Sequence, residues 1–248
     1  ALGNDAGFAV GLAHFSRLKE DLLRDDARHL GARYHLDAIV PGGVAADLGE
    51  AGRRALLAAI PPLAAEVAAL REIYDDHAGL QDRFRGAGAV APALARELGL
   101  IGLAGRASGQ SWDARADHPP APYIGMEVRM SGELDGDVAA RVAVRFDEVV
   151  ESLRLCTRLL ESLPAGSVKA EIPAVPEGRF GLGWVEGWRG PVLVALESGP
   201  GGGIRRCHPH DPSWQNWPVL EHAILGNIVP DFPLINKSFN LSYAGQDL

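Results

Sequence analysis

Apolar side chains recur every three or four residues near the start of the chain. Polar and charged residues fill the positions between them, which is typical of an amphipathic helix that buries one face. The pattern predicts a helix over residues 4–30. We expect it to end at Gly31, because glycine readily adopts the left-handed conformation that closes a helix. The apolar positions are Phe8, Leu12, Phe15, Leu18 and Leu22.

Three further helical patterns follow. Residues 50–77 are rich in Ala and Leu. However, Pro61 and Pro62 lack an amide hydrogen and crowd the preceding turn, so we expect a break or kink there, with two shorter helices sharing the span. Residues 89–98 predict a short helix, and residues 138–163 carry the longest apolar face and predict a core helix.

The character of the chain differs between and after these helices. Residues 102–136 are rich in Gly, Pro and polar side chains, and predict a long loop of the kind that is often functional. Short apolar runs at 168–172, 181–186 and 192–196, separated by Gly and Pro, predict strands. A last short helix is expected at 217–225, before an irregular tail.

These elements predict a mainly α fold of the α+β class. A helix bundle would occupy residues 1–165, and a small antiparallel β-sheet with the tail would occupy residues 166–248. About half of the 248 residues are apolar, which suffices for a real core.

Charge and cysteine content narrow the classes of function. There are 32 Asp and Glu against 24 Lys and Arg, a net charge of -8, so nucleic acid and anionic lipid would be repelled. Cys156 and Cys207 make no disulfide framework and indicate a reducing compartment. No apolar run approaches the roughly 20 residues that span a bilayer.

The first residues predict a fragment. The chain begins at Ala1 without an initiator Met, a basic signal-peptide start or a helix cap. An exposed apolar face on the first helix would then favour pairing either with a partner or with a second copy, and the second of these would give a homodimer of the isolated chain.

Several tempting motifs carry little weight. Cys207, His208, His210 and Asp211 have metal-ligand chemistry, but no second ligand pair is obvious, and a strand end followed by a turn is expected instead. Residues 199–203 lack the Lys-Ser/Thr of a phosphate-binding loop and predict a hairpin turn. No metal site is expected, and without a dinucleotide fingerprint no direct NADH binding is expected either.

A set of ordered motifs covers essentially the whole chain. They lie at residues 3–11, 15–24, 39–44, 102–109, 185–190 and 226–231, with Asp113, Arg115, Asp137, Arg141, Arg145 and Glu148 between them. Together they resemble the family that unites the large subunits of nickel-iron hydrogenases with the quinone-reducing D subunit of respiratory complex I. The similarity extends to large subunits of the formate-hydrogenlyase type, and it implies a hydrogenase large-subunit-like fold.

The resemblance also implies that the nickel ligands are absent. Hydrogenases of this family hold nickel with two Cys-x-x-Cys pairs, because nickel favours thiolates. When Asp247 and Leu248 are aligned with the end of the family pattern, Ser242 and Gly245 stand where the second pair would be. The first pair, and the histidine and tyrosine that bind quinone in complex I, would lie upstream of Ala1.

Six residues are carried over as site candidates. Arg189 matches the arginine of a Pro-Arg-Gly motif, in which Trp188 replaces the proline, and its guanidinium can donate to an anion or a quinone carbonyl. Glu186 and Asp231 match nearby acidic positions that can relay protons if burial raises their pKa. Structural ion pairs are the alternative for all three. The cofactor-binding candidates lie in the long loop and are Arg106, Ser108 and Asp113. The alternative role for these three residues is to anchor the loop through hydrogen bonds.

The expected function is that of a subunit in a membrane-associated, complex I-like oxidoreductase. A cavity between bundle and sheet would receive quinone or another two-electron acceptor. Electrons would come from an iron-sulfur small subunit, since this chain cannot hold a cluster. The location would be peripheral, on the cytoplasmic side of the inner membrane, and the isolated chain would be inactive. An active nickel-iron hydrogenase and a non-catalytic scaffold are the alternatives.

Overall fold

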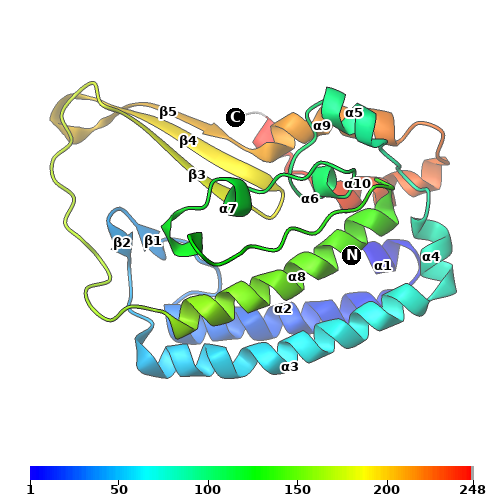
Figure 1. The fold of residues 1–248 in the computed structure, drawn as a ribbon, viewed down its shortest axis with the longest axis horizontal. Coiled ribbons are helices and arrows are strands. Elements are labelled where there is room, and N and C mark those ends of the chain that lie inside the picture. Colours follow the sequence, from blue (N-terminus) through cyan, green and yellow to red (C-terminus); the bar gives the residue numbers. More distant parts are fainter. Residues whose placement is uncertain (247–248) are drawn as a thin grey trace.

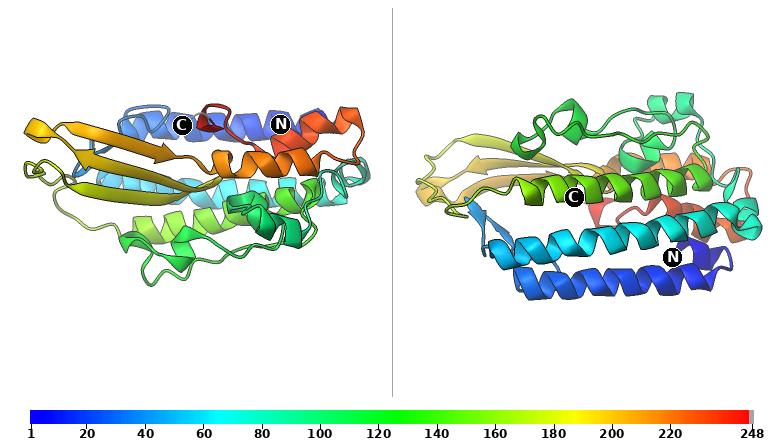
Figure 2. Two further views of the ribbon diagram at one scale, coloured as in Figure 1. Left: turned by 90° about the horizontal axis from the view of Figure 1, so that it is seen from above. Right: turned by 60° about the horizontal axis from the view of Figure 1, so that its bottom comes forward.

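Three long helices form the body of the protein: α2 (Ala9–Leu30), α3 (Gly49–Asp76) and α8 (Val138–Glu161). They lie side by side in the computed structural model, which describes residues 1–246 (Figures 1 and 2). Their apolar faces meet around Tyr74, whose ring centroid lies 6.0 Å from that of Phe15 and 5.6 Å from that of Phe146. The helical patterns therefore identified the helices but only part of their buried faces, because Leu12 and Leu22 of the predicted α2 face are exposed.

The helix predicted for residues 4–30 is divided near its start. A short helix α1 (Leu2–Asp5) precedes α2. Gly7, with a φ of 87°, lies between them. The end of α2 is as predicted, because Gly31 closes it with a φ of 83°.

Pro61 and Pro62 do not divide α3 into two helices. That prediction is wrong, since one helix runs through both prolines. Both prolines are exposed. The carbonyls of Leu57 and Ala58, which lose their usual amide partners, lie one turn earlier, and Ala58 is exposed as well. Water can therefore donate hydrogen bonds to part of the carbonyl groups that the two prolines leave without an amide donor. Packing of the opposite, buried face of α3 stabilises the helix.

The segment between α3 and α8 is less regular. The helix predicted for 89–98 is α5, and the predicted loop 102–136 contains three short helical turns within otherwise irregular chain. The elements are α4 (Ala78–Phe84), α5 (Pro92–Glu97), α6 (Gly102–Arg106), α7 (Ala114–Asp117) and the 3-10 turn η1 (Ala121–Tyr123).

A three-stranded antiparallel sheet runs alongside part of the bundle, and its far end projects past the ends of the helices (Figures 1 and 2). Its strands, in spatial order, are β3 (Phe180–Gly187), β4 (Gly190–Ser198) and β5 (Ile204–His210). The strands predicted at 181–186 and 192–196 lie within β3 and β4. The predicted turn at 199–203 joins β4 to β5 and contains η2 (Pro200–Gly202), and Cys207 lies on β5.

Residues 168–172 do not form the predicted strand. They make two backbone hydrogen bonds to a small hairpin of β1 (Ile39–Val40) and β2 (Gly43–Val44). Pro173 follows directly, and its lack of an amide donor limits any longer ladder.

The end of the chain is more helical than predicted. Helix α9 (Pro212–Ala223) begins before the predicted 217–225, because Asp211 caps it by accepting a hydrogen bond from the Ser213 amide at 2.7 Å. The expected irregular tail contains α10 (Phe232–Phe239), whose Leu234 and Ile235 are buried, between η3 (Val229–Asp231) and η4 (Ala244–Gln246).

The cysteines and helix lengths complete the description. Cys156 on α8 and Cys207 on β5 are free and exposed. Among residues 1–246, none of the helices combines the length and apolar character needed to cross a bilayer.

The prolines in α3 give a test of this fold. Pro62→Ala should raise the free energy of unfolding by about 1–3 kcal/mol, because the new amide can donate to the Ala58 carbonyl. Pro92→Ala is the matched control: Pro92 occupies the first turn of α5, where proline is compatible with the helix, so its replacement should leave stability unchanged or slightly lower. Urea denaturation of the purified chain measures both, and a loss of stability in Pro62→Ala would contradict a continuous helix.

Candidate functional site

The short helix α6 is held tightly against the turn between β3 and β4. Gly102 begins it with a φ of 66°, and a Cβ atom there would collide with the backbone carbonyl of Arg189. Only glycine allows this conformation and this approach without strain. The contact places Arg106, the last residue of α6, beneath β3.

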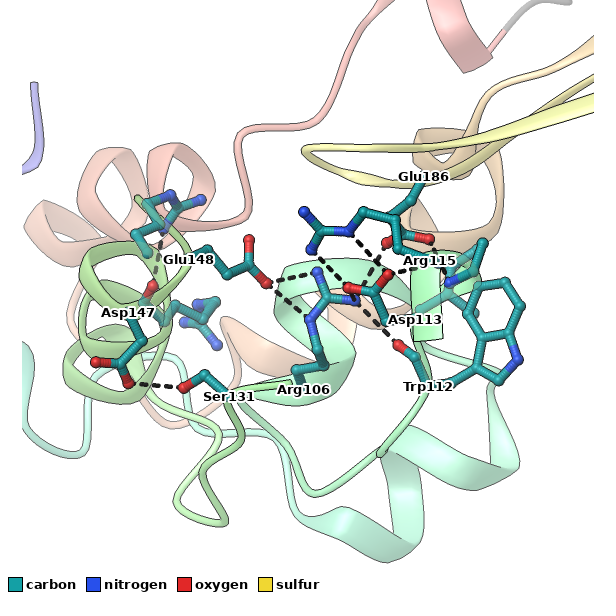
Figure 3. A network of polar contacts seen from close by, with 12 residues as sticks. Arg106, Trp112, Asp113, Arg115, Ser131, Asp147, Glu148 and Glu186 are labelled. Atoms are coloured by element: carbon teal, nitrogen blue, oxygen red, sulfur yellow. Dashed lines mark hydrogen bonds and ion pairs between the residues drawn. The ribbon is translucent and has the colours of Figure 1, made fainter. Parts of the chain in front are cut away.

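Arg106 is the centre of a buried network of charges (Figure 3). Its side chain is 2% exposed. The Nε atom donates to Glu148 on α8 at 2.7 Å, and Nη1 donates to Glu186 on β3 at 3.1 Å and to the Trp112 carbonyl at 3.0 Å. One guanidinium therefore joins α6, α8, β3 and the loop before α7.

Asp113 extends this network. It is 1% exposed, lies 3.6 Å from Arg106, and pairs with Arg115 at 2.7 Å. It also caps α7 through the Arg115 amide. Burial acts to raise the pKa of Asp113, but the hydrogen bonds and charges of Arg115 and Arg106 hold that pKa below its usual value. The Asp113 carboxylate therefore stays ionised.

Glu186 behaves differently from Asp113. Its side chain is 2% exposed, and it accepts hydrogen bonds from Arg106 and from the Ala114 amide at 3.1 Å. Burial and the neighbouring charge of Asp113 raise the pKa of Glu186. With three carboxylates sharing two guanidiniums, Glu186 is the group in this network best suited to take up a proton.

Ser108 is buried next to this network without joining it. Its hydroxyl is fully buried and has no hydrogen-bond partner among residues 1–246. It lies against Gly136, where an added Cβ would be 2.9 Å from the hydroxyl oxygen. A cofactor-binding role for Ser108 stays a prediction.

Arg189 and Asp231 lie apart from the Arg106 network. Arg189, in the β3–β4 turn, donates Nε to the Asn240 carbonyl at 2.5 Å and stacks over the Trp188 ring at 4.3 Å. Asp231 pairs with Arg83 at 2.7 Å. The structure thus brings together Arg106, Asp113 and Glu186 from the six candidates, and a catalytic role for Arg189, Glu186 or Asp231 stays a prediction.

Sequence reasoning did not single out two buried arginines on α8 as site residues. Arg141 donates to the Ser238 hydroxyl at 2.8 Å, and Arg145 donates to the Ser238 carbonyl at 2.5 Å. Burial lowers the pKa of Arg141 to about 9 and that of Arg145 to about 10, so both remain charged at neutral pH. The available signal was their spacing with Glu148, which places three charges on one side of a core helix.

A cavity of about 340 Å³ lies within the helix bundle. It is not between bundle and sheet, where a cavity was expected. Its walls come from α1, α2, α3, α8 and α10, with Phe15, Tyr74 and Phe146 among the apolar lining residues. Its polar lining side chains are Arg145, Lys237 and Asn240. The shape and lining suit an apolar molecule that carries a hydrogen-bond acceptor.

The C-terminal segment shows what occupies the expected nickel-ligand positions. The hydroxyl of Ser242 accepts from the Gly245 amide at 3.1 Å. A Cβ at Gly245 would lie 2.6 Å from the carboxyl carbon of Asp211, so a cysteine does not fit there unless Asp211 moves. A hydroxyl and a glycine cannot replace bridging thiolates, and the residues present do not fit a nickel centre. The alignment that used Asp247 and Leu248 lies outside the described residues.

A long-helix bundle with a small antiparallel sheet is the architecture that the resemblance to hydrogenase-like large subunits predicted. The model of the respiratory-chain NADH dehydrogenase 49 Kd subunit family matches residues 5–178. The chain belongs to this family.

Relatives and a solved structure agree with this assignment. Formate hydrogenlyase subunit 5 of Escherichia coli (strain K12) is 30% identical over 97% of this chain and 42% of its own length. The carbon monoxide-induced hydrogenase of Rhodospirillum rubrum is 29% identical over 96% of this chain and 66% of its own length. A chain of the membrane-bound sulfane sulfur reductase, an archaeal respiratory membrane complex, matches all of this chain and 70% of its own, with a TM-score of 0.88 and 25% identity. This chain therefore spans less than two thirds of the two curated relatives.

The raised pKa of Glu186 predicts a pH dependence of stability. In the unfolded chain the Glu186 carboxyl has its ordinary pKa of 4.5. As pH falls, Glu186 therefore takes up a proton in the folded state before it does so in the unfolded state. The wild-type chain should therefore gain stability relative to Glu186→Gln as pH falls through the window between the raised pKa and 4.5.

Urea unfolding of both chains between neutral and mildly acidic pH measures this difference. Glu177→Gln, which changes an exposed carboxyl shortly before β3, is the matched control. A constant difference between wild type and Glu186→Gln across the window would contradict the buried, proton-accepting assignment.

Proposed function

We propose that this chain is the large-subunit part of a membrane-associated, complex I-like oxidoreductase that passes electrons to quinone or a similar two-electron acceptor. The carrying observation is that Asp211 fills the space beside Gly245. The resemblance to the family places two nickel-binding thiolates at Ser242 and Gly245, and neither residue supplies one. Family membership supports the large-subunit role.

The electron donor in this proposal is an iron-sulfur small subunit. The chain has two cysteines, and an iron-sulfur cluster ordinarily needs four cysteine ligands. The complex would sit at the cytoplasmic side of the inner membrane, with this chain peripheral and attached through its partners. The isolated chain is expected to be inactive and to self-associate.

The acceptor in this proposal enters the cavity in the helix bundle. Apolar walls favour a ring or tail, and Arg145, Lys237 and Asn240 offer donors to a carbonyl oxygen. Arg189 supports the same end of the cavity, because it binds the carbonyl of Asn240, which is a lining residue.

An active nickel-iron hydrogenase is the second candidate. It is favoured by the names of the relatives, a formate hydrogenlyase subunit and a hydrogenase. It is disfavoured by the missing thiolates, since neither a hydroxyl nor a glycine supplies a soft ligand.

Metal analysis of the purified holo-complex separates the two candidates. The proposal predicts nickel far below one atom per complex, because two of the required ligands are missing, together with quinone reduction and no hydrogen uptake or evolution. Stoichiometric nickel with hydrogen turnover would overturn the proposal and establish the hydrogenase.

Arg189 separates a catalytic subunit from a scaffold. In the holo-complex, Arg189→Ala should lower acceptor reduction by about tenfold or more, because this substitution removes a charged donor that holds the cavity end, while assembly is retained. Arg179→Ala is the control, an exposed arginine just before β3. Unchanged turnover in Arg189→Ala would favour a non-catalytic scaffold.

A further inference from the structure

Arg145 presents an unusual charge at the cavity. It lines the cavity wall and donates Nη2 to the Ser238 carbonyl at 2.5 Å and Nη1 to the Arg141 carbonyl at 3.3 Å. Among residues 1–246 no carboxylate forms an ion pair with it. A guanidinium bound only to carbonyls keeps its full charge and has further donors available for a ligand.

The nearest carboxylate along α8 is Glu148, three residues further on. Side chains three residues apart on a helix are neighbours, and opposite charges at this spacing attract each other. Glu148 nevertheless points toward Arg106 (Figure 3), whose Nε and Nη2 atoms lie at 2.7 and 2.6 Å from it. Its ion pair is therefore made with Arg106 on α6, although its charge still acts to raise the pKa of Arg145.

Arg106 is bound by a second carboxylate as well. Glu186 and the Trp112 carbonyl bind Nη1 on the side opposite to Glu148. The orientation of Arg106 therefore depends on β3 and on the loop before α7. A chain of contacts runs from Glu186 through Arg106 to Glu148, about one helical turn from Arg145 on α8.

We propose that Arg106 is a positioning residue for Arg145: by retaining Glu148, it prevents a Glu148–Arg145 pair and leaves the Arg145 guanidinium directed at the cavity. The ligand that Arg145 would bind is the electron acceptor, and this identification of the ligand rests on the proposed function. Without Arg106, the largely buried carboxylate of Glu148, 17% exposed, would lack its partner, and a buried charge without a partner is costly. Arg145 is the cation within reach on the same helix.

The test must preserve the charge balance of the network. Arg106→Met alone leaves two buried carboxylates without a partner and can fail to fold. The double variant Arg106→Met, Glu186→Gln removes one charge of each sign, and Asp113 keeps Arg115. The triple variant, which adds Glu148→Gln, is the matched control because it also removes the competing carboxylate.

The first measurement is the structure of the double variant in the holo-complex. The expected result is an ion pair between Arg145 and Glu148 at about 4 Å or less, in which Arg145 no longer donates to the Ser238 carbonyl. In the triple variant, Arg145 should still donate to Ser238. If Arg145 keeps its hydrogen bond to Ser238 in the double variant, the positioning role is overturned. This outcome does not depend on which molecule the cavity binds.

The second measurement is decylubiquinone reduction by the same complexes. The double variant should raise KM by about tenfold with little change in kcat, as expected when one charged hydrogen bond to the ligand is removed. The triple variant should return KM most of the way to the wild-type value. A Glu148–Arg145 pair in the structure together with an unchanged KM would leave the positioning role intact and overturn the cavity as the acceptor site.

Discussion

One buried guanidinium holds the two parts of this fold in register. Arg106 is the shared partner of Glu148 on α8 and Glu186 on β3, so the helix bundle and the sheet meet through ionic hydrogen bonds as well as through apolar packing. Such an arrangement is specific about geometry, since a buried carboxylate deprived of its partner costs about 3–5 kcal/mol. Gly102 makes it possible, because only a residue without a Cβ lets α6 reach the β3–β4 turn.

A second set of guanidiniums holds the C-terminal segment. Arg141, Arg145 and Arg189 bind Ser238 and the Asn240 carbonyl from α8 and from the sheet. The segment therefore keeps its path across the bundle although it ends in short turns. In hydrogenase-like large subunits this region would carry thiolates; here hydrogen bonds and the close contact of Gly245 with Asp211 take that space. The family fold is retained, and the described part of this segment offers hydroxyl, amide and carboxylate groups.

The cavity depends on both sets of contacts. Its apolar walls are core residues of α2, α3 and α8, and its cationic lining comes from Arg145 and Lys237. Arg145 makes no ion pair with a carboxylate among the described residues, because Glu148 is bound to Arg106. The distribution of buried charge across α6, α8 and β3 thus determines the electrostatic character of a site that none of these elements forms alone.

Much of the architecture followed from local pattern. The apolar spacing located α2 and α8, although Leu12 and Leu22 of the predicted α2 face are exposed. Gly31 marked a helix end, and the Gly/Pro-separated runs identified β3 and β4, because these features depend on neighbours in sequence. The ordered motifs likewise identified the family, whereas the assignment of Ser242 and Gly245 to nickel-ligand positions stays a prediction. Tertiary contacts decided the rest: packing keeps α3 continuous through Pro61 and Pro62, and burial makes α10 a helix. The pairing of Arg106 with Glu148 and Glu186 joins positions 42 and 80 residues apart. No local pattern encodes which carboxylate a buried arginine meets, because that choice is made only when the elements pack.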